Sequence, residues 1–505
     1  MLALAVRNTA KLVREKSKAE NIRLGRLFTK KDTARLMASL VEIDTAKSAY
    51  TILVPGAGTG ILAAAMVERI CKESPACRQI FVTCYENDER FIPMLEDNLE
   101  RIRKKCRHDY DVRLYSTVYA ENYLTESKSH YTVTFFDSVA DKFDIIIQNP
   151  PSELYPKNSP EALSVGGVTQ VKIGAQYLFA RLAATHLEAG GQLVSVLPTS
   201  VATASELRGF RIAMATELSL GKIHLFIGRQ NNAKRAVPLG KNIILAYTKK
   251  EERELVEISV SKGAGSPENT EKLSPLAYDF VVNKEDGTLT LVKSEEDARI
   301  VKYISAFPET LTSLGLKVST GLVIDSRCEG MLFSEPLESS LPIIRPAAIQ
   351  NGRIVFPLPI KNQYIAPTDS RFIQKNKNMI IIKRVPAVSD ERFVNSAIYL
   401  AGQMPKYRYI STHNKINYID TKDKNSEICA RLAFGLFALI NSTIYDRFIS
   451  IISKSKQINA KELKSLPLPP RNLIENIGMR FSALRDTSVA TCDKIVNPTL
   501  HIIER

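Results

Sequence analysis

Long apolar runs are missing from this sequence of 505 residues. No uncharged apolar stretch reaches about eighteen residues, so the sequence predicts no membrane span. The amino-terminal MLALAV is short and is followed at once by basic residues, whereas a secretory signal carries its positive charge before a longer apolar run. We therefore expect a solvated basic helix at this end of the chain, not a signal peptide.

The cysteine and histidine spacings typical of metal sites are also missing. The seven cysteines are scattered and form no CxxC pair, and the six histidines do not gather near them. This distribution predicts reduced thiols and no metal site. The sequence shows no internal repeat, no low-complexity tract and no nuclease motif.

Acidic residues are outnumbered, because 54 Asp and Glu stand against 69 Lys and Arg, a formal net charge of +15. Basic side chains displace counterions from phosphates, so this balance favours a polyanionic partner such as nucleic acid without establishing one. The length predicts two or three domains, and a hydrophobic share of 44% allows large cores.

The first half of the chain alternates short β-branched apolar runs with helical patterns such as Ile61–Ile70 and Tyr177–Leu187. This alternation predicts an α/β fold with a Rossmann-like, mostly parallel sheet that is covered on both faces. The seven apolar runs are Ile52–Val54, Ile80–Tyr85, Val112–Tyr119, Phe143–Ile147, Gln192–Leu197, Ile223–Ile227 and Asn242–Tyr247.

Composition divides the chain into four parts. Residues 1–250 form the α/β domain, and 251–304 are polar and turn-rich, which predicts a connecting region. Residues 305–480 mix short strands and helices, which predicts an α+β domain, and 481–505 form a C-terminal tail. Within the third part, Leu432–Ile452 has the pattern of one long apolar helix.

A glycine-rich turn, TILVPGAGTG at 51–60, joins the first strand to a helix. Without β-carbons, Gly56, Gly58 and Gly60 let a ligand lie against the backbone, at the strand end where open α/β sheets bind ligands. Glu86 at the tip of the next strand is expected to accept hydrogen bonds from ribose hydroxyls. The pair indicates a nucleoside cofactor and leaves both a dinucleotide and S-adenosylmethionine open; a plain turn and a solvated carboxylate are the structural alternatives.

The strand before Asn149 runs directly into Asn149-Pro150-Pro151-Ser152. Two prolines fix φ twice and remove two backbone donors. The side-chain carbonyl of Asn149 and the backbone carbonyl of Pro150 can then hold both N–H groups of an exocyclic amine, whose lone pair can face an electrophilic methyl. Positioning would carry the rate of such a transfer. The alternative is a stiff turn at the end of a strand.

These motifs, in this order, resemble the adenine-N6 DNA methyltransferases, specifically their γ group with its TaqI-like architecture. LGRLFTKKDTARLMASLV resembles the first motif of that group: Gly25, Phe28 and Thr29 match, and Lys30 stands where the family has proline. Thr29 with Asp32 also predicts a capping box for the following helix. Blocks between about residue 20 and about residue 480 resemble the PstI/BsuBI type of modification methylase: 190–200, 223–244, 318–327, 413–419, 440–448 and 456–469.

The resemblance implies methyl transfer from S-adenosylmethionine to N6 of an adenine flipped out of duplex DNA, in the modification half of a restriction–modification system. Residues 1–250 would be the catalytic domain and 305–480 the target-recognition domain. A monomer in the cytoplasm of a bacterium or archaeon, with no membrane association and a separate cognate endonuclease, is expected. The implied catalytic residues are Asn149, Pro150, Pro151 and Ser152, and the implied cofactor-binding residues are Phe28, Thr29, Pro55, Gly56, Gly58, Gly60, Glu86, Asn122 and Tyr123.

Three positions depart from the family pattern. Val54 replaces the usual Asp before the proline of the glycine turn, and Asn122-Tyr123 stands where an acidic residue precedes an aromatic one. Ser152 occupies the position of the aromatic side chain that stacks on the flipped adenine. We expect Tyr155 to supply this stacking after a loop rearrangement, and Phe226 to stack on the other face of the base.

The target adenine must leave the stack before it can react. Basic residues of the first half that are expected to hold the displaced strand are Arg229, Lys234, Arg235 and Lys241. Those of the second half that are expected to contact phosphates or bases are Arg345, Lys383, Arg384, Lys406, Arg408 and Lys415. A solvated charge is the alternative for each. For His413 with Asn414 two interpretations stay open, a contact to DNA and a capped turn, and the turn is favoured. Asn459 predicts a helix N-cap.

Other functions stay open at this point. Protein-glutamine methyltransferases share the NPP motif but lack a basic recognition domain of about 200 residues after it. An inactive homologue would bind DNA and cofactor without transferring methyl, and Ser152 would be the sign of that decay. A NAD-linked dehydrogenase is disfavoured, because its fingerprint does not explain NPP.

Overall fold

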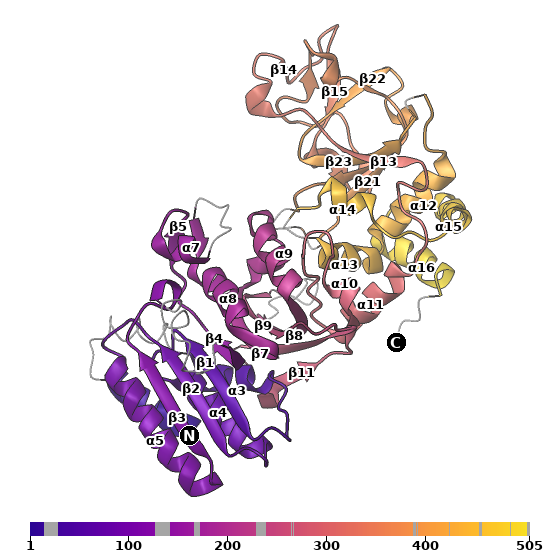
Figure 1. Cartoon of the computed structure of the whole chain (residues 1–505). Coiled ribbons are helices and arrows are strands. Elements are labelled where there is room, and N and C mark those ends of the chain that lie inside the picture. The colour runs from indigo at the N-terminus through magenta and orange to yellow at the C-terminus, as the bar shows by residue number, and fades with distance from the viewer. Residues whose placement is uncertain are drawn as a thin grey trace. The chain divides into compact units, whose positions relative to one another are not determined.

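The computed structural model describes residues 1–14, 29–126, 142–165, 172–228, 239–263, 265, 267–386, 390, 392–423, 425–453, 457–484 and 486–501. The described residues form two compact units, one ending at Ser294 and the other beginning at Glu295 (Figure 1). Phe28, Arg229, Lys234 and Arg235 lie outside the described residues.

A ten-stranded sheet runs through the first unit in the order β11-β10-β8-β9-β7-β4-β1-β2-β3, with β12 paired to β10. The neighbours from β7 to β3 are parallel, β9 is antiparallel between β7 and β8, and β10 is parallel to β8. The predicted α/β class is confirmed, and all seven predicted runs are strands of this sheet. The strands are β1 (Ala49–Pro55), β2 (Gln79–Tyr85), β3 (Arg113–Tyr119), β4 (Phe143–Gln148), β7 (Leu187–Pro198), β8 (Leu218–Ile227), β9 (Leu239–Lys249), β10 (Leu255–Lys262), β11 (Thr270–Lys272) and β12 (Leu276–Ala277).

Helices cover both faces of this sheet. On one face α1, α3, α4 and α5 share a core cluster with alternate strand residues such as Ile145 and Ile147. On the other face α8 packs on β7 and α9 packs on β8. A separate hairpin of β5 (Leu154–Pro156) and β6 (Lys172–Gly174) precedes α8. The helices are α1 (Leu2–Arg14), α3 (Lys31–Ser39), α4 (Ile61–Glu73), α5 (Ile92–Tyr110), α7 (Pro160–Val165), α8 (Ala175–His186), α9 (Arg208–Glu217) and α10 (Tyr278–Val281).

Helix α1 differs from the solvated basic helix that the sequence predicts. Leu2 and Ala5 are buried in the core cluster with α4 and α5, whereas Arg7 and Lys11 stay exposed. The helix is therefore amphipathic, with Arg7 and Lys11 on its outer face.

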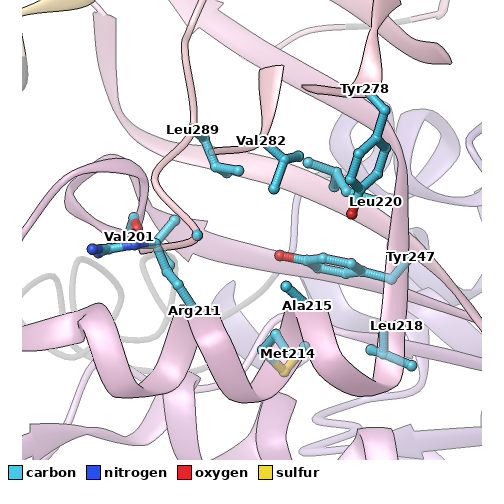
Figure 2. Close-up of a pocket in the computed structure, with 11 residues that line it drawn as sticks. Val201, Arg211, Met214, Ala215, Leu218, Leu220, Tyr247, Tyr278, Val282 and Leu289 are labelled. Atoms are coloured by element: carbon cyan, nitrogen blue, oxygen red, sulfur yellow. Dashed lines mark hydrogen bonds between the residues drawn. The ribbon is translucent and has the colours of Figure 1, made fainter. Parts of the chain in front are cut away.

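The predicted connecting region, 251–304, also differs from the structure. Residues up to Ser294 belong to the first unit, where β10 pairs with β8 over six residue pairs and extends the sheet. Figure 2 shows Tyr278 and Val282 facing Tyr247 and Met214 of α9 around a cavity of about 20 Å³, roughly the space of one water molecule. The segment is therefore packed onto the sheet, and its polar residues mark turns on the surface.

The second unit combines a six-stranded sheet, a five-stranded sheet and several helices, an α+β arrangement as predicted. Its sheets follow the orders β13-β23-β20-β21-β17-β16 and β14-β18-β15-β22-β19. The elements are α11 (Glu295–Ser305), β13 (Leu316–Thr320), β14 (Leu332–Phe333), β15 (Leu341–Ile344), β16 (Ile349–Gln350), β17 (Arg353–Ile354), β18 (Tyr364–Ile365), β19 (Gln374–Lys375), β20 (Met379–Lys383), β21 (Ser396–Tyr399), β22 (Tyr409–Thr412), β23 (Ile416–Thr421), α12 (Ala430–Asn441), α13 (Thr443–Ile452), α14 (Ala460–Lys464), α15 (Arg471–Leu484) and α16 (Val489–Thr499).

The apolar segment predicted as one helix is two helices. α12 and α13 are bent by 68° at Ser442, whose hydroxyl accepts a hydrogen bond from the backbone of Tyr445 and so caps α13. No single helix of the described residues is long and apolar enough to cross a membrane, and this bent pair meets the criterion by length and composition alone. Helices α15 and α16 both pack on α12, so the described part of the predicted C-terminal tail belongs to this unit.

Candidate active site

The glycine turn presents backbone to a cavity at the edge of the first unit's sheet. Gly56, Gly58 and Gly60 have φ angles of 64°, 56° and 83°, in the left-handed region that glycine adopts without a steric penalty. Gly56 and Gly58 line a cavity of about 440 Å³, within the roughly 300–1,000 Å³ range of small-molecule sites. Pro55 ends β1 and Gly60 precedes α4, and neither lines the cavity.

Glu86 follows β2 and lines the same cavity. Its carboxylate accepts hydrogen bonds from the backbone N–H groups of Gly58 at 2.6 Å and of Asp88 at 2.9 Å. Burial raises the pKa of this carboxyl group, and the backbone hydrogen bonds oppose the shift. Each carboxylate oxygen keeps further accepting capacity, which suits hydroxyl donors of a ligand.

The proline-rich corner lies beside the glycine turn. Asn149, Pro150, Pro151 and Ser152 all line the cavity that Gly56 and Gly58 line. This juxtaposition follows from the sheet, because β4 and β1 are parallel neighbours and their carboxyl ends meet at one edge.

The side chain of Asn149 is held by Thr29. Its Nδ2 donates to Oγ1 of Thr29 at 3.0 Å, which leaves Oδ1 as the accepting atom of the amide. The predicted capping box of Thr29 and Asp32 is wrong. The N-cap of α3 is Lys30, which makes no side-chain capping bond. Thr29 precedes that position, and its hydroxyl is instead directed to Asn149.

Asn122 and Tyr123, which follow β3, also line the cavity. The Oδ1 of Asn122 accepts a hydrogen bond from the backbone of Leu124 at 3.0 Å, so this amide fixes the first turn after the strand. Tyr123 is 2% exposed, and its hydroxyl lies 2.9 Å from Nδ1 of His186. Its ring lies 5.3 Å from that of Phe179, so Tyr123 is rigidly placed.

Of the two aromatic residues predicted to stack on a base, the structure brings Tyr155 to the cavity. Tyr155 lies in β5, and its hydroxyl donates to Glu153 at 3.2 Å. Burial and the Glu153 carboxylate raise the pKa of Tyr155 to about 12, so its hydroxyl stays protonated near neutral pH. Phe226 does not line the cavity. Its ring lies edge-on to that of His224 at 4.9 Å and packs against the core cluster that α1, α3, α4 and α5 share with the sheet.

Several residues that line the cavity lie outside the sequence motifs. Tyr85 and Phe179 add aromatic rings, and the acidic side chains Asp88, Glu121 and Glu153 join Glu86, against the single arginine of this lining, Arg90. Such a lining favours a cationic ligand. The one shared signal of the acidic residues is their position just after a strand. The described residues contain no group of three or more His, Cys, Asp or Glu able to hold a metal ion.

The basic residues predicted to contact DNA differ in exposure. Arg345 is 9% exposed and donates two hydrogen bonds to Asp325, at 3.1 and 2.8 Å. Lys383 pairs with Asp390 at 2.9 Å, and Arg384 is half-buried. The candidates with exposed side chains are Lys241, Lys406, Arg408 and Lys415.

Two predicted caps are confirmed in the second unit. Nδ1 of His413 accepts a hydrogen bond from the backbone of Lys415 at 3.2 Å and so closes a turn. Asn459 caps α14 and forms a capping box with Glu462. Both His413 and Asn459 therefore have a structural role within their own segments of the chain.

The fold is the one that the sequence predicts for a methyltransferase, and the similarity to known proteins agrees. The chain is 27% identical over 493 residues to Type II methyltransferase M.PstI of Providencia stuartii, covering 95% of this chain and 94% of that protein. It is 24% identical over 476 residues to Type II methyltransferase M.BsuBI of Bacillus subtilis, covering 92% and 90%. The predicted resemblance to the PstI/BsuBI type is therefore confirmed. No family model matches the chain.

Solved structures give remote similarities. The type IIL restriction-modification enzyme MmeI in complex with DNA matches with a TM-score of 0.45 and 11% identity, over 100% of this chain and 74% of that chain. The type IIG restriction endonuclease BpuSI matches with a TM-score of 0.42 and 10% identity, and this chain spans 64% of its length.

Proposed function

We propose that this protein transfers a methyl group from S-adenosylmethionine to N6 of an adenine turned out of duplex DNA, as the modification enzyme of a restriction–modification system. The observation that carries the proposal is the shared cavity of the Asn149-Pro150 corner and the glycine turn. The relatives support it, since both are named Type II methyltransferases.

The residues at the cavity fit S-adenosylmethionine. Gly56 and Gly58 leave space against the backbone, Glu86 offers carboxylate oxygens to ribose hydroxyls, and the acidic lining suits a sulfonium cation. When bound, this cofactor supplies an electrophilic methyl group. Of the other predicted cofactor residues, Tyr123 would pack beside it, and Thr29 acts on Asn149.

The protein's own part in the reaction is to hold the amine. Oδ1 of Asn149 and the backbone carbonyl of Pro150 accept its two N–H groups, which leaves the nitrogen lone pair directed away from both acceptors. Because Thr29 occupies Nδ2, the amide presents its oxygen without a rotational search. Tyr155 stacks on the base in place of the family aromatic at the Ser152 position.

Recognition of DNA falls to the second unit in this proposal. Lys406, Arg408 and Lys415 are its exposed candidates, and the net charge of +15 favours phosphate contacts. We further propose that the protein acts as a monomer in the cytoplasm of a bacterium or archaeon. Its cognate endonuclease would be a separate chain.

The test is methyl transfer from labelled S-adenosylmethionine to mixed duplex DNA, followed by digestion to nucleosides. We expect label in N6-methyl-2′-deoxyadenosine with the wild-type protein and none with Asn149→Ala, while cofactor affinity changes less than about threefold. Asn283→Ala, at an exposed turn of the same unit, is the matched control and should keep full transfer.

Other outcomes identify the alternatives. Label in a cytosine product would contradict adenine as the target. Label in protein but not in DNA would indicate a protein-glutamine methyltransferase. Cofactor binding without transfer to any DNA would indicate an inactive homologue.

A further inference from the structure

Four buried polar side chains lie at the glycine turn. They are Asn8 and Thr9 of α1, Thr59 of the turn itself and Asn98 of α5, with exposed fractions of 8%, 4%, 1% and 0%. We call this group the loop brace. None of the four lines the cavity, and no sequence motif contains α1.

The loop brace is a continuous chain of hydrogen bonds. Nδ2 of Asn98 donates to the backbone carbonyl of Thr59 at 2.8 Å, and Oδ1 of Asn98 accepts from Nδ2 of Asn8 at 3.0 Å. The hydroxyls of Thr9 and Thr59 lie 2.7 Å apart. Thr9 donates its own proton to the carbonyl of Ala5 at 2.8 Å, so Thr59 is the donor in the bond between the two threonines.

This arrangement answers a physical difficulty of the turn. Thr59 lies between Gly58 and Gly60. Fixing a glycine in one backbone conformation costs more conformational entropy than fixing any other residue. The loop brace bonds the backbone carbonyl and the hydroxyl of Thr59, and both groups are buried. A buried polar group without a hydrogen-bond partner would destabilise the fold. Two helices thus hold the turn through Thr59, while Glu86 holds it through the backbone of Gly58.

We infer that α1 and α5 are part of the cofactor-binding machinery, and that Thr9 and Asn8 are positioning residues for the glycine turn. The inference rests on the proposed function, in which this turn binds S-adenosylmethionine. It assigns a role to an amino-terminal helix that precedes every recognised motif of the chain.

The test compares Thr9→Val, which keeps the shape but removes the hydroxyl, with Thr9→Ser, which keeps the hydroxyl. For Thr9→Val we expect cofactor affinity by calorimetry to fall about fivefold, as loss of one hydrogen bond predicts, with kcat at saturating cofactor nearly unchanged. Thr9→Ser should restore the affinity. Thr248→Val is the matched control, a buried threonine of β9 that bonds Arg253 outside the cavity.

A second readout needs no cofactor. Backbone amides of residues 56–60 should exchange with deuterium faster in Thr9→Val than in the wild type or in Thr248→Val. Unchanged affinity together with unchanged exchange would overturn the inference, even if the melting temperature falls. A wild-type protein that binds no S-adenosylmethionine would overturn the proposed function, whereas the exchange rates would still decide whether α1 holds the turn.

Discussion

Asn149 donates a hydrogen bond to Thr29 at 3.0 Å, although 120 residues separate them in the sequence. The bond joins the first recognised motif of the chain to the corner that is proposed to hold the target amine. It also fixes the orientation of the Asn149 amide. Nδ2 donates to the Thr29 hydroxyl, so Oδ1 is left to accept a hydrogen bond from a ligand.

Replacing Thr29 by Val should slow methyl transfer because the Asn149 amide loses its fixed orientation. We expect kcat to fall about five- to tenfold, the equivalent of roughly 1 kcal/mol for one hydrogen bond, in single-turnover kinetics. Thr29→Ser should behave like the wild type. If instead cofactor affinity falls while kcat is unchanged, Thr29 contacts the cofactor directly.

Removing the ring of Tyr155 should weaken capture of the flipped base. Base stacking on an aromatic side chain contributes about 1–3 kcal/mol, so kcat/KM for DNA in Tyr155→Ala should fall by about 5- to 150-fold. Tyr155→Phe, which loses only the bond to Glu153, should stay within about threefold. Tyr115→Ala, an exposed aromatic of β3 outside the cavity, is the control. Full activity in Tyr155→Ala would show that another group stacks on the base.

Acid should destabilise the fold through two buried histidines. Burial lowers the pKa of His224 to about 4, and burial together with the Arg345 charge lowers the pKa of His413 to about 4. The unfolded chain therefore binds more protons between about pH 6.5 and pH 4, so stability falls as pH drops through that window. We expect a loss of about 2 kcal/mol per histidine at pH 5 relative to pH 8, measured by denaturant unfolding.

The test of this pH dependence is His413→Gln, which should flatten the decline of stability below pH 6.5 relative to the wild type. Equal curves for the two proteins would contradict the assignment.

Arg345 and Lys415 should affect different properties. Arg345→Ala removes a buried guanidinium and its bonds to Asp325 and to the carbonyl of Asn362. Because the Asp325 side chain is 50% exposed, the loss of stability should be modest, about 1–3 kcal/mol in urea unfolding. Lys415→Ala should leave stability unchanged and reduce the salt slope of DNA binding by about 0.9. A loss of DNA affinity in Arg345→Ala without any loss of stability would show that Arg345 contacts DNA.

The sequence predicted the elements whose signals are local. The seven apolar runs became strands because short segments rich in apolar and β-branched residues are typical of strands in a largely parallel sheet. β10 was missed because Leu255–Lys262 lies among charged turns and becomes a strand of the sheet only by pairing with β8. The break at Ser442 was missed because serine interrupts a helix only where its hydroxyl caps the next one.

In the site, too, the residues with a local sequence signal were predicted and those placed by long-range packing were not. The glycine turn and the NPP corner were recognisable, since backbone geometry demands those residue types. Phe179 and Tyr85 were not, because they occupy ordinary core positions of α8 and β2 and reach the cavity through packing. The partner of Asn149 and the partner of Arg345 are long-range contacts that no spacing in the sequence reveals.

The pairing of β10 with β8 decides where this protein can be cut and rejoined. A fragment that ends at residue 250 would leave β8 as a bare edge of the sheet, ready to associate with another chain. A fragment that ends at Ser294 keeps that edge covered. A fragment that is to contain the whole first unit should therefore end at Ser294, where the sheet is already complete.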